Sequence, residues 1–529
     1  MSDIFGKPMY PSLAEWCDII EEKLEDPGDE PIWNVAPPEV DDRPFDAIFL
    51  GGGGAGRFGA AFMRARGGRP LLIEKWPFLG GSCPHEACVP HHILSECAKE
   101  LDRAKWFSGQ LWFPEFDPKK VSILDCIELV KEGRAGAHAL MNVQTKEQLD
   151  VEYVLNAWGN VIDKHTVEVA GRTFTGKNLV LCTGVRTQYP EIPGTDLKGV
   201  YDFASLLSDL DYEPSRCVII GGSKVAMEYG SFFQAAGVPT TILTRKPLMT
   251  TASLHHVDED LRRYVVEMME LRGIEIIDGI EPAEILGNGR VTGVRYTTAA
   301  GELATIDTDF VFIATGERPT AASQAFIDLL GLETDERGFV KVNKRMETSV
   351  PGIYATGDLI GPPMEQFKAR HSGCAAARNI MGEDYEWDCS EYADFLHTTY
   401  EVVWCGLSEA EAREEYGQNN VIKIQLPPDG LPHENCAFPA GEGTMMFACR
   451  FPELTGFAKL VIVSDTRKIV GAHYCGSGVK NVFQYLDHLI RRPEGITIDE
   501  LGQFNELQVN DLFIQLCRLR AGQAVLSDL

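Results

Sequence analysis

An apolar strand that runs directly into a glycine-rich turn constrains the fold of this chain more than any other feature. Residues 45–50, FDAIFL, predict a buried strand, because a short apolar run that ends in glycines is typical of one. Three glycines follow in the G-x-G-x-x-G spacing: Gly51, Gly53 and Gly56. A helical stretch and the strand PLLIEKW come next, and Glu74 stands about 20 residues after the first glycine, where an acid binds a ribose hydroxyl. This β-α-β unit predicts a dinucleotide site; a glycine turn of purely structural origin is the alternative.

A second strand–glycine–helix–strand unit lies further along the chain. The strand RCVIIGG, a helix and the strand TTILTRK follow one another, and the turn carries Gly221, Gly222 and Ser223, with Ala226 at the third glycine position. Arg245 and Lys246 stand where the first unit carries Glu74. Because cations there suit a 2′-phosphate, this unit predicts NADPH in preference to NADH. A solvated charge pair at a strand end is the alternative.

The two ends of the chain differ from these nucleotide units. Residues 1–43 are acidic, with one helical patch near LAEWCDIIEEKL, and predict a surface extension packed on the main body. From about residue 392, strands such as KLVIVSD and KIVGAHYCG alternate with helices. That alternation is typical of a separate α+β domain.

Charge and composition exclude several classes of partner. The chain has 529 residues and a net charge of −29, which argues against nucleic-acid binding. No apolar run reaches the roughly 18 residues that span a bilayer, and the first residues show no signal-peptide pattern, so we expect a cytoplasmic protein without membrane contact. The fourteen cysteines have no disulfide-framework spacing, which predicts reduced thiols. An anionic substrate would need a local cluster of positive charge.

The segment GGSCPHEACVPHH carries the sharpest chemical signal. Cys83 and Cys88 are separated by four residues in a turn-to-helix context, and Pro84 suits the first turn of a helix. A thiol at a helix N-terminus has a lowered pKa, so the pair predicts a reactive dithiol. Two buried structural cysteines, or a zinc site with His91 and His92, are the alternatives. The chain shows no second pair of zinc ligands, so we expect no metal.

These motifs, the segment TSVPGIYATGD and the closing α+β domain together resemble the pyridine nucleotide-disulfide oxidoreductases, such as glutathione reductase and lipoamide dehydrogenase. The resemblance implies FAD and NADPH as cofactors and a homodimer. It also implies that Cys88 is the thiol beside the flavin, that Cys83 is the thiol that meets substrate, and that Asp358 contacts FAD. The further residues expected at the cofactor sites are Gly81, Ser82, Gly357 and Glu228.

The implied fold is α/β and glutathione-reductase-like, with two Rossmann-like nucleotide-binding domains and a C-terminal α+β dimerisation domain. The expected boundaries are an N-terminal extension at 1–44, an FAD domain at 45–190 and 320–390, an NADPH domain at 191–319 and a dimerisation domain at 391–529.

Two positions depart from the ordinary family pattern. The helix after the second cysteine usually carries Ser-Lys, and here it carries His91 and His92. The C-terminal segment usually holds a histidine with a partner glutamate, and here Gln508 stands at the histidine position, in ELQVNDLF. The usual general acid–base pair is therefore missing. We expect Gln508, His85 and His92 to act in catalysis beside the two cysteines.

A narrower resemblance is to the 2-ketopropyl-coenzyme M oxidoreductases/carboxylases of this family. The shared segments are CPHxACVPHH, GRFG, FKAR, DFLHTxYEV and the acidic N-terminal extension. The resemblance implies that Arg57 and Arg370 bind the sulfonate of coenzyme M, and that His85, His138 and Met141 line the ketone and CO2 end. Surface salt bridges for the arginines, and core packing for His138 and Met141, are the alternatives.

That resemblance implies NADPH-dependent cleavage of a β-keto thioether such as 2-ketopropyl-coenzyme M, with carboxylation of the released enolate to acetoacetate. Its members carry Phe at the position of Gln508 and a His downstream, where this chain has Leu512. A Gln amide, unlike a His, cannot give a proton to an enolate near pH 7. The alternative is a disulfide reductase, or reductive thioether cleavage without carboxylation. A non-catalytic, redox-responsive interaction protein is disfavoured by the cysteine pair and the two nucleotide folds.

Overall fold

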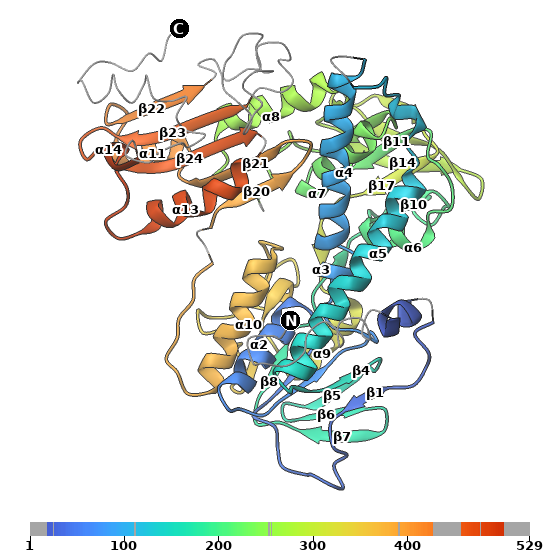
Figure 1. Ribbon diagram of the computed structural model, residues 1–529, viewed down its shortest axis with the longest axis vertical. Helices are drawn as coiled ribbons and strands as arrows, with labels where there is room; N and C mark the ends of the chain where they lie inside the picture. Colours follow the sequence, from blue (N-terminus) through green and yellow to red (C-terminus); the bar gives the residue numbers. More distant parts are fainter. Residues whose placement is uncertain are drawn as a thin grey trace.

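The computed structural model describes residues 18–24, 26–109, 113–251, 254, 256–389, 392–426, 456–476 and 478–501. Two parallel sheets, an antiparallel sheet near the C-terminal end and a pair of long helices dominate these ranges (Figure 1). Within them, no helix is long and apolar enough to cross a membrane.

The first sheet has six strands in the order β1-β4-β3-β2-β8-β19, and only β1 runs antiparallel to its neighbour. Strands β2 and β3 are buried throughout, which explains their continuous apolar sequence. The strands are β1 Ile32–Asn34, β2 Ala47–Leu50, β3 Pro70–Ile73, β4 Glu152–Leu155, β8 Leu179–Leu181 and β19 Ile353–Ala355. Around the sheet lie α2 Gly54–Ala65, α9 Ala321–Leu330, η3 Gly357–Ile360, α10 Gln366–Ile380 and a small sheet of β5 Gly159–Asp163, β6 Thr166–Val169 and β7 Arg172–Thr175.

Glycines set how closely α2 approaches its neighbours. The strand predicted at residues 45–50 is β2, and it begins at Ala47. A Cβ at Gly56 would lie 1.9 Å from the Gly51 carbonyl oxygen, so α2 meets the end of β2 at a distance that only glycine allows. A Cβ at Gly373 of α10 would lie 2.1 Å from the Ala55 carbonyl oxygen of α2. The two helices are therefore packed backbone to backbone (Figure 1).

The second parallel sheet repeats the same design. Its order is β10-β17-β11-β12-β13, and all its neighbours are parallel. The elements of this region are β10 Val200–Tyr201, α6 Phe203–Asp209, β11 Cys217–Ile220, α7 Lys224–Ala235, β12 Thr240–Leu243, α8 Glu259–Leu271, β13 Glu275–Ile277 and β17 Phe310–Ile313, with an antiparallel sheet of β14 Glu281–Gly287, β15 Val291–Thr297 and β16 Leu303–Asp307. The short strands β9 Arg186–Thr187 and β18 Glu317–Arg318 pair with each other.

The described part of the C-terminal region is a five-stranded antiparallel sheet in the order β20-β21-β24-β23-β22. The predicted strands KLVIVSD and KIVGAHYCG are β23 and β24, so the expected α+β pattern is confirmed. The elements are β20 Asp394–His397, β21 Glu401–Gly406, α11 Glu409–Tyr416, β22 Val421–Leu426, β23 Phe457–Val463, β24 Ile469–Gly476, α13 Val479–Arg491 and α14 Ile498–Leu501.

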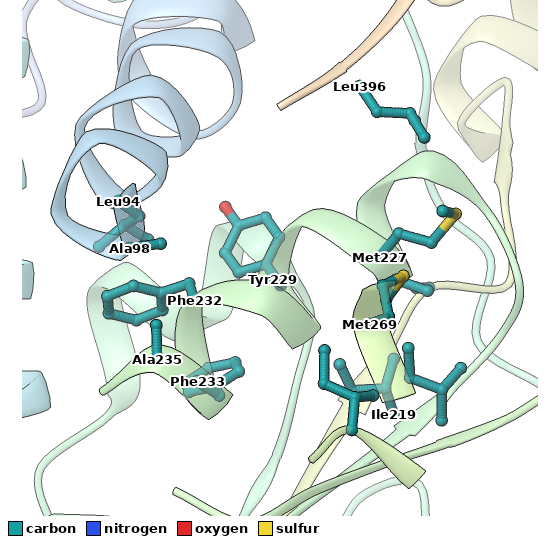
Figure 2. Close-up of a cluster of buried hydrophobic side chains, with 14 of the residues drawn as sticks. Leu94, Ala98, Ile219, Met227, Tyr229, Phe232, Phe233, Ala235, Met269 and Leu396 are labelled. Carbon is teal, nitrogen blue, oxygen red and sulfur yellow. The ribbon is translucent and has the colours of Figure 1, made fainter. Parts of the chain in front are cut away.

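Two long helices connect the nucleotide units. They are α4 Cys88–Phe107, preceded by the short α3 Ser82–His85, and α5 Ile123–Asn142, preceded by η1 Pro118–Lys120 and followed by the π-helix η2 Val143–Gln148. Leu94 and Ala98 of α4 pack against Phe232 and its neighbours on α7 (Figure 2). The helix that begins at Cys88 is thus anchored on the second nucleotide unit.

The described part of the N-terminal segment packs on the main body. Residues 18–24 are helical, and Ile20 is fully buried against Phe78, Ala139 and Val143. Strand β1 then adds to the edge of the first sheet. The segment before the first nucleotide unit therefore covers part of it.

Candidate active site

Cys83 and Cys88 lie at the junction of α3 and α4. The backbone amides of Glu86 and Ala87 both donate to the Ser82 carbonyl oxygen at 2.8 Å, and this turn brings the two thiols together. Both cysteines are unbridged and half-buried. A hydrogen bond from the Cys88 thiol, reinforced by the nearby arginine side chains, lowers the pKa of Cys83. Cys83 is therefore the more acidic thiol.

Cys88 behaves differently from a typical thiol at a helix N-terminus. It is the first residue of α4, where a lowered pKa is expected. Its hydrogen bond to Cys83, together with burial, instead raises its pKa well above the usual value. The pKa of Cys83 is lowered and that of Cys88 is raised, so the negative charge of the pair rests on Cys83.

The glycine turn of the first unit fits a dinucleotide. Gly51 has φ +111°, and a Cβ there would lie 2.3 Å from the Cys182 carbonyl oxygen. Gly81 has φ +66°, and a Cβ there would lie 2.6 Å from the Gly53 Cα, so the segment before Cys83 touches the glycine turn directly. Glu74 is buried at the end of β3 and accepts a 2.6 Å hydrogen bond from the Gly52 amide. These residues form the turn and the acid that a dinucleotide requires.

Asp358 is independent evidence for a polar ligand near the first glycine turn. It follows Gly357 at the start of η3, and its Oδ1 is buried without a hydrogen-bond partner. Burial raises the pKa of this carboxyl group. An unpartnered buried oxygen normally costs stability unless a ligand or water satisfies it. The position therefore fits the FAD contact expected for Asp358. Ser82 accepts a hydrogen bond from Arg186 at 3.1 Å and lies on the same segment as Cys83.

The second unit has the same backbone frame with different side chains. A Cβ at Gly221 would lie 2.1 Å from the Ala314 carbonyl oxygen, which parallels Gly51, and a Cβ at Gly222 would lie 2.3 Å from Thr244 Oγ1. Ser223 is the N-cap residue of α7, and its hydroxyl donates to the Ala314 carbonyl at 3.1 Å. Ala226 is fully buried, so this helix tolerates the methyl group that Gly56 excludes. Arg245 and Lys246 follow β12 and are exposed, with no ion pair recorded for either within the described ranges.

Glu228 and the histidines of α4 form a separate cluster. Glu228 Oε2 lies 3.1 Å from His91 Nε2, and its Oε1 accepts a 2.8 Å hydrogen bond from the His397 amide. Burial raises the pKa of Glu228 to about 8 and lowers that of His91 to about 4, which describes a neutral acid beside a neutral imidazole. His92 is exposed, and its ring contacts those of His91 and His397. The histidine that meets the Glu228 carboxyl group is therefore His91, which the sequence singled out as a possible zinc ligand and, with His92, as a departure from the family's Ser-Lys pair. Among the described residues, no group of three or more His, Cys, Asp or Glu could hold a metal ion.

Two arginines gather beside Cys83; we call Arg57 and Arg370 the charged cluster. Arg57 of α2 is only 6% exposed, Arg370 of α10 is exposed, and both guanidinium groups pack on the Phe58 ring, at 4.6 and 4.8 Å from its centroid. Arg57 donates to neutral oxygens of Gln144 and Thr145 at 3.3 Å. Burial, followed by the charge of Arg370, lowers the pKa of Arg57 to about 10. Within the described ranges, neither arginine has a carboxylate partner at salt-bridge distance.

An aromatic cluster lies near the same cysteine and consists of Trp76, Phe78, His85 and His138. The His85 ring is 4.7 Å from both Trp76 and Phe78, and the His138 ring is 4.1 Å from Phe78. Burial lowers the pKa of His85 to about 3 and that of His138 to about 4. Both imidazoles are therefore neutral at pH 7.

The tautomer of His138 follows from its hydrogen bond. Its Nδ1 lies 2.7 Å from the Leu79 carbonyl oxygen, which can only accept, so Nδ1 carries the proton. Its Nε2 is then an acceptor, and this atom is buried without a partner. Met141, one turn further along α5, lies against the loop before Cys83: a Cβ at Gly80 would stand 2.6 Å from its sulfur.

The residues that sequence reasoning missed here are Trp76, Phe78 and Ile20. The first two lie in the segment WPFLGG between β3 and Gly81, and an aromatic pair directly before the cysteine loop is the signal that could have identified them. Ile20 contacts Phe78 only through the fold. Gln508 lies outside the described residues.

The two nucleotide units, the closing antiparallel sheet and the cysteine pair define a flavoprotein disulfide reductase. The chain belongs to the pyridine nucleotide-disulphide oxidoreductase family: the family model matches residues 45–374, and the model of its dimerisation domain matches residues 392–503. The family uses FAD and a pyridine nucleotide, as expected from the sequence.

Several known proteins are similar over most of the chain. Mercuric reductase of Staphylococcus aureus is 26% identical over 466 residues, which cover 87% of this chain and 79% of that protein. Dihydrolipoyl dehydrogenase of Haemophilus influenzae is 28% identical over 454 residues, which cover 81% and 85%. The structure of a Cu(II) complex of the HOCl-induced flavoprotein disulfide reductase RclA from Escherichia coli matches with a TM-score of 0.72 at 21% identity, over 89% of this chain and 99% of that one. The predicted glutathione-reductase-like fold is confirmed.

Proposed function

We propose that this flavoprotein uses NADPH to cleave a sulfonated β-keto thioether, 2-ketopropyl-coenzyme M or a close analogue, and leaves the enolate to capture CO2. The observation that carries the proposal is the charged cluster. Arg57 and Arg370 lie close enough to Cys83 to lower its pKa, and neither has a carboxylate partner within the described ranges. Because a buried cation without a counter-charge is costly, this arrangement fits an anionic substrate. A sulfonate is such an anion.

The redox part of the proposal uses the family's cofactors. When bound, FAD would carry electrons from the nicotinamide to the Cys83–Cys88 pair. The residues that would hold it are Gly51, Gly53, Gly56, Glu74, Gly81, Ser82, Gly357 and Asp358. Gly221, Gly222 and Ser223 would hold the pyridine nucleotide, with Glu228 between the second unit and α4.

The reduced pair would then act on the thioether. The Cys83 thiolate attacks the thioether sulfur, the carbon–sulfur bond breaks, and its electron pair leaves with the carbon as an enolate. A mixed disulfide now joins Cys83 to coenzyme M. Cys88, once deprotonated, attacks the Cys83 sulfur, releases the coenzyme M thiolate and restores the Cys83–Cys88 disulfide. A ketone is needed, since only an enolate is stable enough to leave as a carbanion here.

The fate of the enolate depends on the acids around it. An enolate takes a proton readily from a nearby acid, and an imidazolium would supply one. His85 and His138 are neutral at pH 7, and His138 presents an acceptor nitrogen. The aromatic cluster therefore favours carboxylation to acetoacetate over protonation to acetone. Gln508 would hold the enolate oxygen by an amide hydrogen bond, in the manner of an oxyanion-hole donor.

The second candidate function is a disulfide reductase, or reductive cleavage of the thioether without carboxylation. The family assignment supports it, because the matching family model is that of the pyridine nucleotide-disulphide oxidoreductases. The candidates are separated by following NADPH oxidation with 2-ketopropyl-coenzyme M and with small disulfides, each with and without bicarbonate. NADPH oxidation that requires the thioether and bicarbonate supports the carboxylating thioether cleavage. NADPH oxidation with disulfides alone supports a disulfide reductase in its place.

The preference for NADPH is a separate proposal and rests on Arg245 and Lys246. Exposed cations at the end of β12 suit a 2′-phosphate, and the double change Arg245→Ala/Lys246→Ala should raise the KM for NADPH about tenfold while sparing NADH. Steady-state kinetics with both nucleotides measures this. A parent enzyme that prefers NADH would contradict the assignment.

We also propose that the protein is a homodimer. The dimerisation-domain model of the family matches residues 392–503, which include the antiparallel sheet. Light scattering of the purified protein measures the mass directly. A monomer at micromolar concentration would contradict this proposal.

A further inference from the structure

A second pair of cysteines lies between α4 and α5, away from the Cys83–Cys88 pair. The two helices approach closely at Gly133, where a Cβ would stand 2.4 Å from the Ile93 side chain. Cys97 lies one turn after Ile93 on α4, and Cys126 lies two turns before Gly133 on α5. Both steps return to the same face of the helix, so the two cysteines face each other across the packed pair. Their thiols lie close enough for each to shift the pKa of the other.

This pair differs from the other described cysteines. Ten cysteines fall within the described ranges, and all are unbridged. In two pairs of them, Cys83–Cys88 and Cys97–Cys126, the thiols lie close enough to shift the pKa of each other. Buried cysteines such as Cys217 have a raised pKa and are shielded from reagents. Cys97 and Cys126 therefore share the arrangement of the redox pair rather than that of core cysteines.

The exposure and the acidity of Cys97 suit it for attack on a small oxidant. Both thiols are half-buried at the margin of the core that joins α4 to α7. The hydrogen bond from Cys126 lowers the pKa of Cys97 to about 7, so a large fraction is thiolate near neutral pH. The same bond raises the pKa of Cys126, which keeps its proton. Cys97 is therefore suited to attack the oxidant, and Cys126 is suited to displace the oxidised group from Cys97 and form the disulfide.

We propose that Cys97 and Cys126 form a second dithiol–disulfide site, which a small two-electron oxidant such as a peroxide converts to a disulfide between α4 and α5. The Cys97 thiolate attacks a peroxide oxygen, the O–O bond breaks, and water leaves after protonation, so that Cys97 becomes a sulfenic acid. The Cys126 sulfur then displaces the hydroxyl group as a second water. The two thiols lose two electrons and two protons in total, and the peroxide becomes two molecules of water.

The proposed disulfide would join two helices that carry candidate active-site residues. Helix α4 begins with Cys88, and α5 carries His138 and Met141 near its end. A covalent link between the helices fixes the elements on which these three side chains lie. The oxidised form therefore holds α4 and α5 in their packed arrangement until a thiol reductant cleaves the disulfide. This inference does not depend on the substrate proposed for Cys83.

Peptide mapping of the parent protein tests the proposal. The protein, prepared without NADPH so that Cys83 and Cys88 are already oxidised, receives about one equivalent of hydrogen peroxide and then an alkylating agent. A Cys97–Cys126 cross-linked peptide, lost after treatment with a thiol reductant, is expected. Cys374 is the internal control: it is equally half-buried, its thiol bonds a backbone carbonyl, and it should remain free for alkylation.

The variant Cys126→Ser separates attack from resolution. It keeps Cys97 but cannot form the cross-link, so a dimedone adduct should accumulate on Cys97 many-fold above the parent. Free alkylation of both cysteines in the peroxide-treated parent would overturn the proposal. Equal dimedone labelling of parent and variant would also overturn it, because Cys126 would then not resolve the sulfenic acid.

Discussion

The charged cluster and the aromatic cluster treat charge in opposite ways, although both lie beside Cys83. The charged cluster keeps two guanidinium groups, one of them almost fully buried, without a carboxylate partner at salt-bridge distance in the described ranges. The aromatic cluster has two ionisable imidazoles, and burial keeps both of them neutral at pH 7. The charged cluster thus has positive charge that an anionic ligand would compensate, whereas the imidazoles of the aromatic cluster carry no charge.

This difference teaches how the site would orient a substrate. A sulfonate gains most beside the two arginines, where charge-assisted hydrogen bonds replace its lost hydration. An uncharged ketone loses little hydration beside aromatic rings. The thioether sulfur of such a molecule would lie at Cys83, whose pKa both arginines lower and which stands two residues before His85. Breaking either cluster should therefore change a different property of the reaction.

The largest effect is expected at the cysteine that both clusters share. Cys83→Ala should abolish turnover of the thioether and leave reduction of the flavin by NADPH intact, because the proposed mechanism makes Cys83 the thiolate that meets substrate. Stopped-flow absorbance of the flavin and product analysis measure the two properties. Cys88→Ala is the matched variant, and it should trap a coenzyme-M-sized adduct on Cys83. Mass spectrometry that finds no adduct with any sulfonated thioether would remove coenzyme M from the account.

The charged cluster should control binding of the anion and the acidity of Cys83. Arg57→Ala or Arg370→Ala should raise the KM for the sulfonated substrate about tenfold or more, since a charge-assisted hydrogen bond contributes roughly 1.5–3 kcal/mol. The KM for NADPH should change much less. Equal effects on both would mean that the arginines are structural.

The same variants should move the pH profile in a predictable direction. The arginines lower the pKa of Cys83, so their removal raises it and protonates the thiol at a higher pH. Activity is lost as the pH falls through this pKa, and the acidic limb of the profile should therefore move to higher pH. A limb that stays in place would show that the guanidinium charges do not act on Cys83.

The aromatic cluster should control product choice with a smaller effect. The Phe78 ring packs against the rings of His85 and His138 and against Ile20. Phe78→Ala removes these contacts, so we expect water to reach the enolate. The acetone-to-acetoacetate ratio should rise several-fold. Phe78→Leu keeps an apolar side chain and is the control that should retain the parent ratio. An unchanged ratio in Phe78→Ala would contradict the role assigned to this cluster.

The sequence predicted those parts of the molecule whose signals are local. Strand β2 with its glycine turn, the second unit with Gly221, and strands β23 and β24 all follow from apolar runs and glycine positions. The pairing of β8 with β19 could not be read from spacing alone. The sequence also could not show that His91, and not His92, meets Glu228. Adjacent residues of a helix point in directions about 100° apart, so the packing of α4 against α7 decides which of the two faces Glu228.

The parts of the site that the sequence missed depend on contacts between distant segments. Ile20 reaches Phe78 from the N-terminal helix, and Cys97 meets Cys126 only because α4 and α5 pack together. The lowered pKa of Cys83 depends in part on such contacts, since after the hydrogen bond from Cys88 the charges of Arg370 on α10 and Arg57 on α2 also lower it. Local helix rules do not include those charges.

The most direct test of the account is to incubate the enzyme with NADPH, 2-ketopropyl-coenzyme M and isotopically labelled bicarbonate, and to identify the product. The account predicts labelled acetoacetate as the main product of the parent enzyme, because the imidazoles near Cys83 are neutral and a Gln amide cannot protonate the enolate. Gln508→His should shift the product toward acetone. Mainly acetone from the parent at saturating CO2, or no turnover of this thioether, would contradict the account.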